Sequence, residues 1–102
     1  MPKQEYLFAY GTLRDPAIQQ SVMGRKLIGE PDTLEHYAPS QVITDNEAYP
    51  ALIKSKVISV DGIVFAVDAE DFNAIDKYEG KEYKRIVAQL KSGREAWVYI
   101  KK

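Results

Sequence analysis

The sequence contains no cysteine and only one histidine, and both absences narrow the chemistry that it can carry. Without cysteine there is no disulfide framework, no thiolate nucleophile and no cysteine-bound metal. A zinc site would have no histidine pair to anchor it, and a Ser-His-Asp triad would depend on His36 alone. The residues around His36 indicate a strand, where a lone histidine is more often structural than catalytic. We therefore expect no metal ion.

The sequence also lacks an excess of one charge and any long hydrophobic run. It has 14 basic and 15 acidic residues, whereas nucleic-acid-binding proteins usually show a basic excess or a basic stripe. Its apolar stretches are far shorter than a membrane-spanning helix. The segment Met1–Glu5 lacks the apolar run of a secretory signal. The expectation is a soluble cytoplasmic protein that binds neither nucleic acid nor membranes, with its oligomeric state left open.

Two short helices are predicted from their end signals. Asp15 and Pro16 are typical of an N-cap followed by the first helical residue, and Gly24 is a plausible stop. Asp68 opens the second helix with acidic residues in its first turn, which suits the helix dipole. Gly80 ends that helix at the usual position of a left-handed C-cap.

The remaining segments have strand patterns. Tyr6–Tyr10 is a continuous apolar run that predicts a buried central strand ending at Gly11. Val57–Val67 predicts a longer strand, in which Gly62 suggests a bulge or a close backbone approach. Two strands joined by Ser92-Gly93 predict a hairpin. They cover Tyr83–Leu90 and Glu95–Ile100.

The stretch between residues 26 and 59 is predicted to be broken into short strand-like pieces. Prolines and the pair Asp45-Asn46 separate its apolar segments. The pieces are Leu27–Ile28, Leu34–Tyr37, Gln41–Ile43 and Ala51–Ile53. With the other elements they predict one α+β domain over residues 1–102. Its architecture is a small mixed, mostly antiparallel β-barrel with two short flanking helices.

Among the acidic residues, Glu79 is distinguished by its position. It lies at the end of the second predicted helix, between Tyr78 and Gly80. The negative end of the helix dipole and the aromatic neighbour both disfavour the charged carboxylate, so they raise its pKa. A raised pKa suits a residue that exchanges protons near neutral pH. From these facts alone, an ordinary surface glutamate at a helix end is the simpler interpretation.

The turn Tyr10-Gly11-Thr12-Leu13 is the second candidate feature. A strand that turns at glycine can present successive backbone N–H groups to an anion, and the helix that starts nearby adds further unpaired donors. A substrate carboxylate would suit such a site. Taken singly, a plain strand-to-helix turn explains the segment as well.

Together these segments resemble the γ-glutamylcyclotransferase-like superfamily, which includes γ-glutamylamine cyclotransferases and the AIG2-like proteins. Leu7–Arg14 resembles its opening signature, and Ile75–Gly80 with the following Tyr83 and Arg85 resembles its second signature. Tyr49–Leu52 and Val60–Gly62 match intermediate segments. The motifs follow the order of the family and span nearly the whole chain. The resemblance implies a small mixed barrel with flanking helices.

The resemblance also implies an activity and its residues. Enzymes of this family release 5-oxoproline and a free amine from a γ-glutamyl amine or γ-glutamyl amino acid, an acyl-transfer cyclisation without a cofactor. By resemblance, Tyr10, Gly11, Thr12 and Leu13 hold the glutamyl group, Glu79 accepts the proton and Tyr83 lines the site. Glu82 and Asp76 do not match the catalytic position. The short chain leaves little room for a lid over a glutathione-sized substrate, which favours γ-glutamylamines.

Two other functions are compatible with the same sequence. One is a non-catalytic small-molecule-binding domain that keeps the fold and the Tyr10–Leu13 turn. Glu79 in its motif argues against this, because a pure binder needs no acid/base group there. The other is a protein-interaction module, which an exposed apolar patch in the structure would favour.

Overall fold

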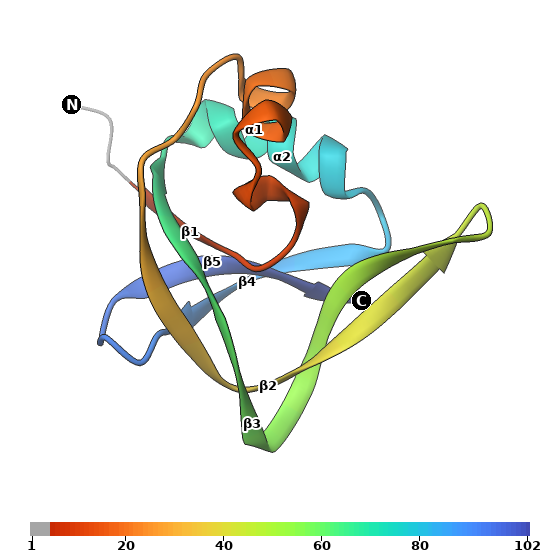
Figure 1. The fold of residues 1–102 in the computed structure, drawn as a ribbon, viewed down its shortest axis with the longest axis vertical. Helices are drawn as coiled ribbons and strands as arrows, with labels where there is room; N and C mark the ends of the chain where they lie inside the picture. Colours follow the sequence, from red (N-terminus) through yellow and green to blue (C-terminus); the bar gives the residue numbers. More distant parts are fainter. Residues whose placement is uncertain (1–4) are drawn as a thin grey trace.

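The computed structural model describes residues 5–102. The signal-peptide inference rests partly on the first four residues, which lie outside the described residues. Five strands form one sheet in the order β2-β3-β1-β5-β4, and its neighbours are antiparallel except for the parallel pair β1 and β5. Their bounds are β1 Glu5–Ala9, β2 Gly29–Thr44, β3 Glu47–Val67, β4 Tyr83–Gln89 and β5 Glu95–Lys101. The sheet curls into a half-barrel, and the two helices lie together on one side of it (Figure 1). The predicted mixed, mostly antiparallel α+β architecture is confirmed.

Both helices start at the N-caps that the sequence predicts. Helix α1 (Pro16–Met23) starts at Asp15, whose carboxylate accepts a hydrogen bond from the Ala17 N–H, and it ends at Gly24 with φ +76°. Helix α2 (Ala69–Glu79) starts at Asp68 in a complete capping box. Gly80 ends it with φ +83° and ψ −176°, so the left-handed C-cap predicted there is wrong. The chain passes directly from the helix towards β4 through a backbone conformation that is open almost only to glycine.

The expected series of short pieces between residues 26 and 59 is also wrong. Strands β2 and β3 form one long hairpin, with Asp45-Asn46 as its tight turn at positive φ. Pro31 and Pro39 lie inside β2, which is an edge strand and so tolerates a missing N–H. Pro50 lies in the part of β3 that pairs only with β2, since β1 pairs with residues 63–67. The prolines therefore mark sheet edges rather than breaks between strands.

Two irregular positions shape the hairpin. His36 has φ +69° at a shift of register, where two steps along β2 from Glu35 to Tyr37 face five steps along β3 from Lys54 to Ser59. Gly62 lies where a Cβ atom would stand 2.5 Å from the Ala9 carbonyl oxygen and 2.6 Å from the Phe8 ring. The close approach expected at Gly62 is thus confirmed, and it allows β3 to cross tightly beside the end of β1.

Strand β1 is apolar from Tyr6 to Ala9, and Leu7, Phe8 and Ala9 are buried on its two faces. Leu7 and Ala9 pack in the cluster that includes Phe72 and Ile75 of α2. Phe8, on the opposite face, packs in a second cluster inside the curl of the sheet. Burial on both faces requires an unbroken apolar run, so β1 is the central strand that the sequence predicts.

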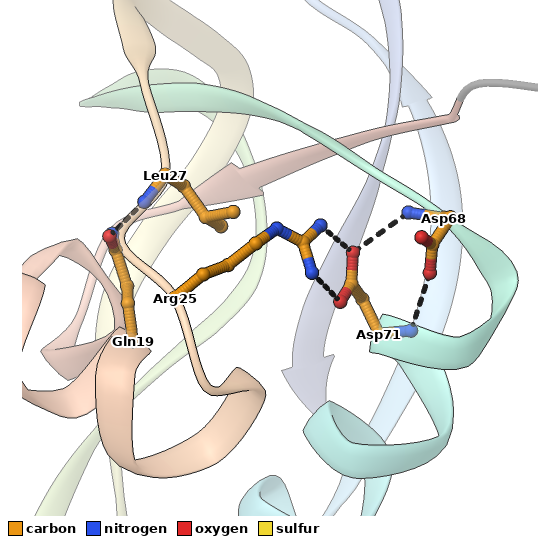
Figure 2. A network of polar contacts seen from close by, with 5 residues as sticks. All are labelled: Gln19, Arg25, Leu27, Asp68 and Asp71. Atoms are coloured by element: carbon orange, nitrogen blue, oxygen red, sulfur yellow. Dashed lines mark hydrogen bonds and ion pairs between the residues drawn. The ribbon is translucent and has the colours of Figure 1, made fainter.

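A polar network ties α1 and the segment after it to α2 (Figure 2). The Arg25 guanidinium donates two hydrogen bonds to the Asp71 carboxylate, at 2.7 and 2.5 Å. The Asp71 carboxylate also accepts from the Asp68 N–H, which closes the capping box. On α1, the buried Gln19 side chain accepts from the Leu27 N–H at 2.8 Å. These bonds fix the two helices against each other and above the sheet.

Of the helices in residues 5–102, neither has the length and apolar character that crossing a membrane would require.

Candidate active site

A pocket of about 340 Å³ opens where β1 runs into its following turn. Its wall is formed by β1, the turn after it, the last turn of α2 and the start of β4, together with residues of the β2–β3 hairpin and β5. The residues lining it are Leu7, Phe8, Ala9, Tyr10, Gly11, Thr12, Leu13, Val42, Tyr49, Pro50, Tyr78, Glu79, Glu82, Tyr83 and Tyr99. Segments from both ends of the chain therefore meet around one cavity.

All six residues that the sequence singles out lie in the wall of this pocket. Four of them are the turn Tyr10–Leu13, in which Leu13 is buried and Thr12 is exposed. Glu79 comes from the end of α2 and Tyr83 from the start of β4. The fold thus brings the candidate acid/base residue and the candidate cradle to a single cavity, 66 or more residues apart in the sequence.

Glu79 is half-buried, and this burial raises its pKa from 4.5 to about 7. Within the described part of the chain, no lysine or arginine lines the pocket to offset the loss of hydration. The carboxyl group therefore lies close to the midpoint of its titration at neutral pH. A group in this state both accepts and returns a proton at little cost in free energy.

The tyrosines beside Glu79 keep their protons. The Tyr10 hydroxyl donates a hydrogen bond to the Tyr99 backbone carbonyl at 2.5 Å. Burial, with the nearby Glu79 carboxylate as a second cause, raises the pKa of Tyr10. The same two causes, in the same order, raise the pKa of Tyr83. These hydroxyls are hydrogen-bonding groups at neutral pH, whereas the raised pKa of Glu79 suits that carboxyl group to proton transfer.

Two hydrogen bonds connect the segments around the pocket. The Thr12 Oγ1 and Tyr78 hydroxyl oxygens are 2.5 Å apart, which links the turn after β1 to the end of α2. The Tyr83 hydroxyl donates to the Pro50 carbonyl at 2.6 Å and so links β4 to the hairpin. Both bonds connect elements that no backbone ladder joins.

Hydrogen bonds from α1 and from Arg14 hold the Tyr10–Leu13 turn in place. Gln19 of α1 donates a hydrogen bond to the Leu13 carbonyl at 2.8 Å. The Gly11 carbonyl accepts from the Arg14 N–H and from the Arg14 side chain, each at 3.2 Å. The Gly11 N–H has no acceptor in the part of the chain that the structure describes. This donor is available to a carboxylate or an oxyanion in the pocket.

Several lining residues were not recognised from the sequence. Glu82, set aside as lying outside the catalytic position, adds an exposed acidic group to the pocket. Tyr78 and Tyr49 add exposed aromatic rings, and Tyr99 reaches the cavity from β5. The position of Tyr78 beside Glu79 in the sequence is a signal that could have placed its ring in the wall of the pocket. No sequence pattern identifies Tyr99, because its place depends on the pairing of β5 with β1.

The residues described offer no obvious metal site. Among residues 5–102, no three His, Asp or Glu side chains are grouped so that they could hold a metal ion. His36, exposed at the register shift between β2 and β3, lines a different and shallower surface depression.

Comparisons with known proteins agree with the architecture. A family model described as "Gamma-glutamyl cyclotransferase, AIG2-like" matches residues 7–102. Protein AIG2 C of Arabidopsis thaliana is 24% identical over 90 residues, which are 87% of this chain and 53% of that protein. The chain thus spans about half the length of this curated relative.

Solved structures show the same fold. A structure named gamma-glutamyl cyclotransferase superposes with a TM-score of 0.83 at 15% identity. The match covers 98% of this chain and 68% of that one. An Arabidopsis thaliana protein solved in solution gives a TM-score of 0.80 at 22% identity, over 99% of this chain and 64% of that one. At these identities the similarity concerns the fold.

Proposed function

The chain belongs to the γ-glutamyl cyclotransferase, AIG2-like family, and from this premise we propose that it is a cyclotransferase acting on a small γ-glutamyl amine or γ-glutamyl amino acid. The products are 5-oxoproline and a free amine. The observation that carries the proposal is a half-buried Glu79, with its pKa raised to about 7, in the same pocket as the Tyr10–Leu13 turn.

The reaction needs little beyond positioning and proton transfer. The α-amine of the substrate attacks its own γ-carbonyl carbon, a C–N bond closes the five-membered ring, and the bond to the leaving amine breaks. Because nucleophile and electrophile belong to one molecule, the enzyme mainly selects the reactive conformer. A pocket of about 340 Å³ is suited to holding a glutamyl group with a small amine.

Glu79 supplies both proton transfers in this proposal. The α-amine is an ammonium at neutral pH and must lose a proton before it attacks, and ionised Glu79 accepts it. As the bond to the leaving amine breaks, protonated Glu79 gives that proton to the leaving nitrogen, so the carboxyl group ends in its initial state. The attacking nitrogen gives up a second proton to water and keeps one as the lactam N–H, and the free amine takes up a proton from water. A pKa of about 7 favours neither direction strongly.

The turn after β1 supplies the polar groups of the cradle. The Gly11 N–H points to an anion-binding role for either the substrate carboxylate or the oxyanion that develops at the γ-carbonyl. The Tyr10 hydroxyl already donates to the Tyr99 carbonyl, so its oxygen offers lone pairs to the pocket. An ammonium group of the substrate is the natural partner for those lone pairs.

The charges of the pocket favour an amine over a peptide as the leaving group. Its ionisable carboxyl groups are those of Glu79 and Glu82, and no basic side chain of the described residues lines it. The C-terminal carboxylate of a glutathione-sized substrate would meet acidic rather than basic side chains there. The acidic lining therefore supports a preference for γ-glutamylamines.

A second candidate, the protein-interaction module, has one observation in its favour. Ile53, Val57 and Ile58 of β3 are exposed apolar side chains, and Val57 is 90% exposed. None of them lines the pocket. Val57→Ser is therefore expected to leave turnover unchanged if the enzyme proposal is right, and to abolish a protein contact if the module alternative is right.

The test of the proposed function is a screen of γ-glutamyl compounds for release of 5-oxoproline. It compares γ-glutamylamines, γ-glutamyl amino acids and glutathione at equal concentration. We expect turnover to be fastest with a γ-glutamylamine and slowest with glutathione. Binding of several compounds without release of 5-oxoproline would favour the non-catalytic binding domain and retire the enzyme proposal.

A further inference from the structure

Tyr99 of β5 contacts both halves of the candidate active site. Its side-chain hydroxyl donates a hydrogen bond to Asp76 Oδ1 at 2.5 Å. Its backbone carbonyl accepts the hydrogen bond from the Tyr10 hydroxyl, also at 2.5 Å. One residue therefore holds the helix that carries Glu79 by its side chain and the first residue of the cradle by its main chain.

Asp76 and Glu79 share the last turn of α2. Residues three apart are neighbours on a helix surface, so a bond that fixes Asp76 also fixes the turn from which Glu79 projects. Gly80 follows immediately and ends the helix, so no further helical turn supports this end. The position of the Glu79 carboxylate therefore depends on side-chain contacts such as the one from Asp76 to Tyr99.

Arg85 supports Asp76 from β4. Its guanidinium lies 3.6 Å from Asp76 Oδ2. It also lies 4.0 Å from the centre of the Phe72 ring and 4.6 Å from the Trp97 ring, so three partners restrict it. With one carboxylate oxygen facing Arg85 and the other accepting from Tyr99, Asp76 has a defined orientation.

The Tyr99 hydroxyl is a dependable donor in this arrangement. Its residue is only 5% exposed. Burial and the hydrogen bond to Asp76 raise its pKa, so it keeps its proton at neutral pH. If Asp76 were removed, the buried hydroxyl would have no acceptor and the folded state would be destabilised, since little water is available to replace the carboxylate.

We propose that Tyr99 is a positioning residue for catalysis, which acts through Asp76 to set the Glu79 carboxylate against the Tyr10–Leu13 cradle. This inference rests on the proposed function and extends it to two residues outside the matched catalytic position. A purely structural hydrogen bond would affect the stability of the fold. A positioning bond affects kcat and the titration of Glu79 in a protein that is still folded.

The test compares Tyr99→Phe, Asp76→Ala and Asp76→Asn. Tyr99→Phe keeps the ring and removes the donor, and Asp76→Ala removes the acceptor. We expect each to lower kcat for a γ-glutamylamine by about ten- to a hundredfold, the effect of misplacing a reacting group by about 1 Å, with KM changed less than kcat. Asp76→Asn keeps an acceptor oxygen and is expected to retain most of the turnover.

Non-additivity provides the decisive comparison. If the two residues act through one bond, the double variant Tyr99→Phe with Asp76→Ala is no slower than either single variant. Tyr37→Phe is the matched control, because it removes a tyrosine hydroxyl outside the pocket. Losses that multiply in the double variant, or a Tyr99→Phe enzyme with unchanged kcat, would overturn the proposal.

A second readout does not require turnover. The titration of Glu79, followed by NMR of labelled glutamate, is expected near pH 7 in the wild type and at a lower pH in Tyr99→Phe, because a displaced helix end admits water. An unchanged midpoint in the folded variant contradicts the positioning role. If the wild type turns over no γ-glutamyl compound, the proposed function fails while this titration still decides the positioning. If Tyr99→Phe does not fold, Asp76→Ala, altered at a half-exposed side chain, serves for the same measurement.

Discussion

The two ends of helix α2 each carry a carboxyl group removed from water, and the structure treats them in opposite ways. At the N-terminal end, burial alone would raise the pKa of Asp71, but hydrogen bonds from Arg25 and from the Asp68 N–H outweigh it, so the pKa is lowered. At the C-terminal end, no basic side chain of residues 5–102 lines the pocket, and burial raises the pKa of Glu79 to about 7.

The pKa values of Asp71 and Glu79 shift in opposite directions because the groups around the two carboxylates differ. A buried carboxylate with a guanidinium and a backbone donor is fixed in its charged form, and it serves the fold. A half-buried carboxyl group without a cation costs stability when it ionises, and it can exchange a proton at neutral pH. One helix therefore has a structural end and a candidate catalytic end, and each can be altered without the other.

The largest effect is expected at the C-terminal end. Glu79→Gln keeps the size of the side chain but cannot accept the ammonium proton, so 5-oxoproline release is expected to fall by roughly two to four orders of magnitude. The measurement is the initial rate with the best γ-glutamyl substrate. Glu70→Gln, exposed on the first turn of the same helix, is the control and is expected to keep the wild-type rate.

Glu82→Gln separates the two acidic residues of the pocket. Its loss of rate is expected to be much smaller than that of Glu79→Gln, because Glu82 lies outside the matched catalytic position. Full turnover by the Glu79→Gln enzyme, or equal losses in the two variants, would show that Glu79 is not the base.

The next effect is at the N-terminal end and concerns stability. Asp71→Asn removes the charge from the bonds to Arg25 and weakens the capping box, so the free energy of unfolding is expected to fall by about 2 kcal/mol. Urea denaturation at pH 7 measures it. The lowered pKa means that this stabilisation is present above the unfolded-state value of roughly 3.9 and is lost as the pH falls further.

The same variant should leave the candidate active site intact. Turnover of Asp71→Asn is expected to stay near the wild-type rate at a temperature where the variant is folded. A rate loss as large as that of Glu79→Gln would show that the two ends of α2 are not independent.

The last effect is confined to high pH and has the opposite sign to most mutations, because the variant is the more stable protein. Because the folded pKa of Glu79 is raised, the native state binds more protons than the unfolded state between pH 4.5 and about 7. Its contribution to stability is therefore complete below about 4.5 and is lost as the pH rises through 7. Glu79→Gln removes this loss, so the variant is expected to be more stable than the wild type at pH 8, by on the order of 2 kcal/mol.

Urea denaturation of both proteins at pH 4 and pH 8 measures this difference. The advantage of the Glu79→Gln variant should be present at pH 8 and absent at pH 4. Equal stabilities at both values would mean that the Glu79 carboxylate is hydrated in the folded protein.

Local signals in the sequence were sufficient for the helices and for the central strand. Asp15 and Asp68 carry their capping function in their own side chains, and β1 is apolar because each of its faces meets a core cluster. These features depend on a few neighbouring residues, so a sequence pattern records them directly.

The long hairpin and part of the pocket depend on partners distant in the sequence. Pro39 and Pro50 look like interruptions until the strand order places them at sheet edges. Glu82 and Tyr99 belong to the pocket because β4 and β5 bring them to the end of β1. The wall of the pocket is therefore a product of strand pairing, which the local pattern does not contain.

The prolines of β2 have one more consequence, for contacts between molecules. An exposed edge strand is a template on which another chain can add a strand through backbone hydrogen bonds, the route to aggregation. Pro31 and Pro39 leave two positions of that edge without an N–H, and the register shift at His36, with its positive φ, lies between them. The long hairpin can thus reach beyond the helices to complete the pocket and still resist the growth of the sheet into a neighbouring copy.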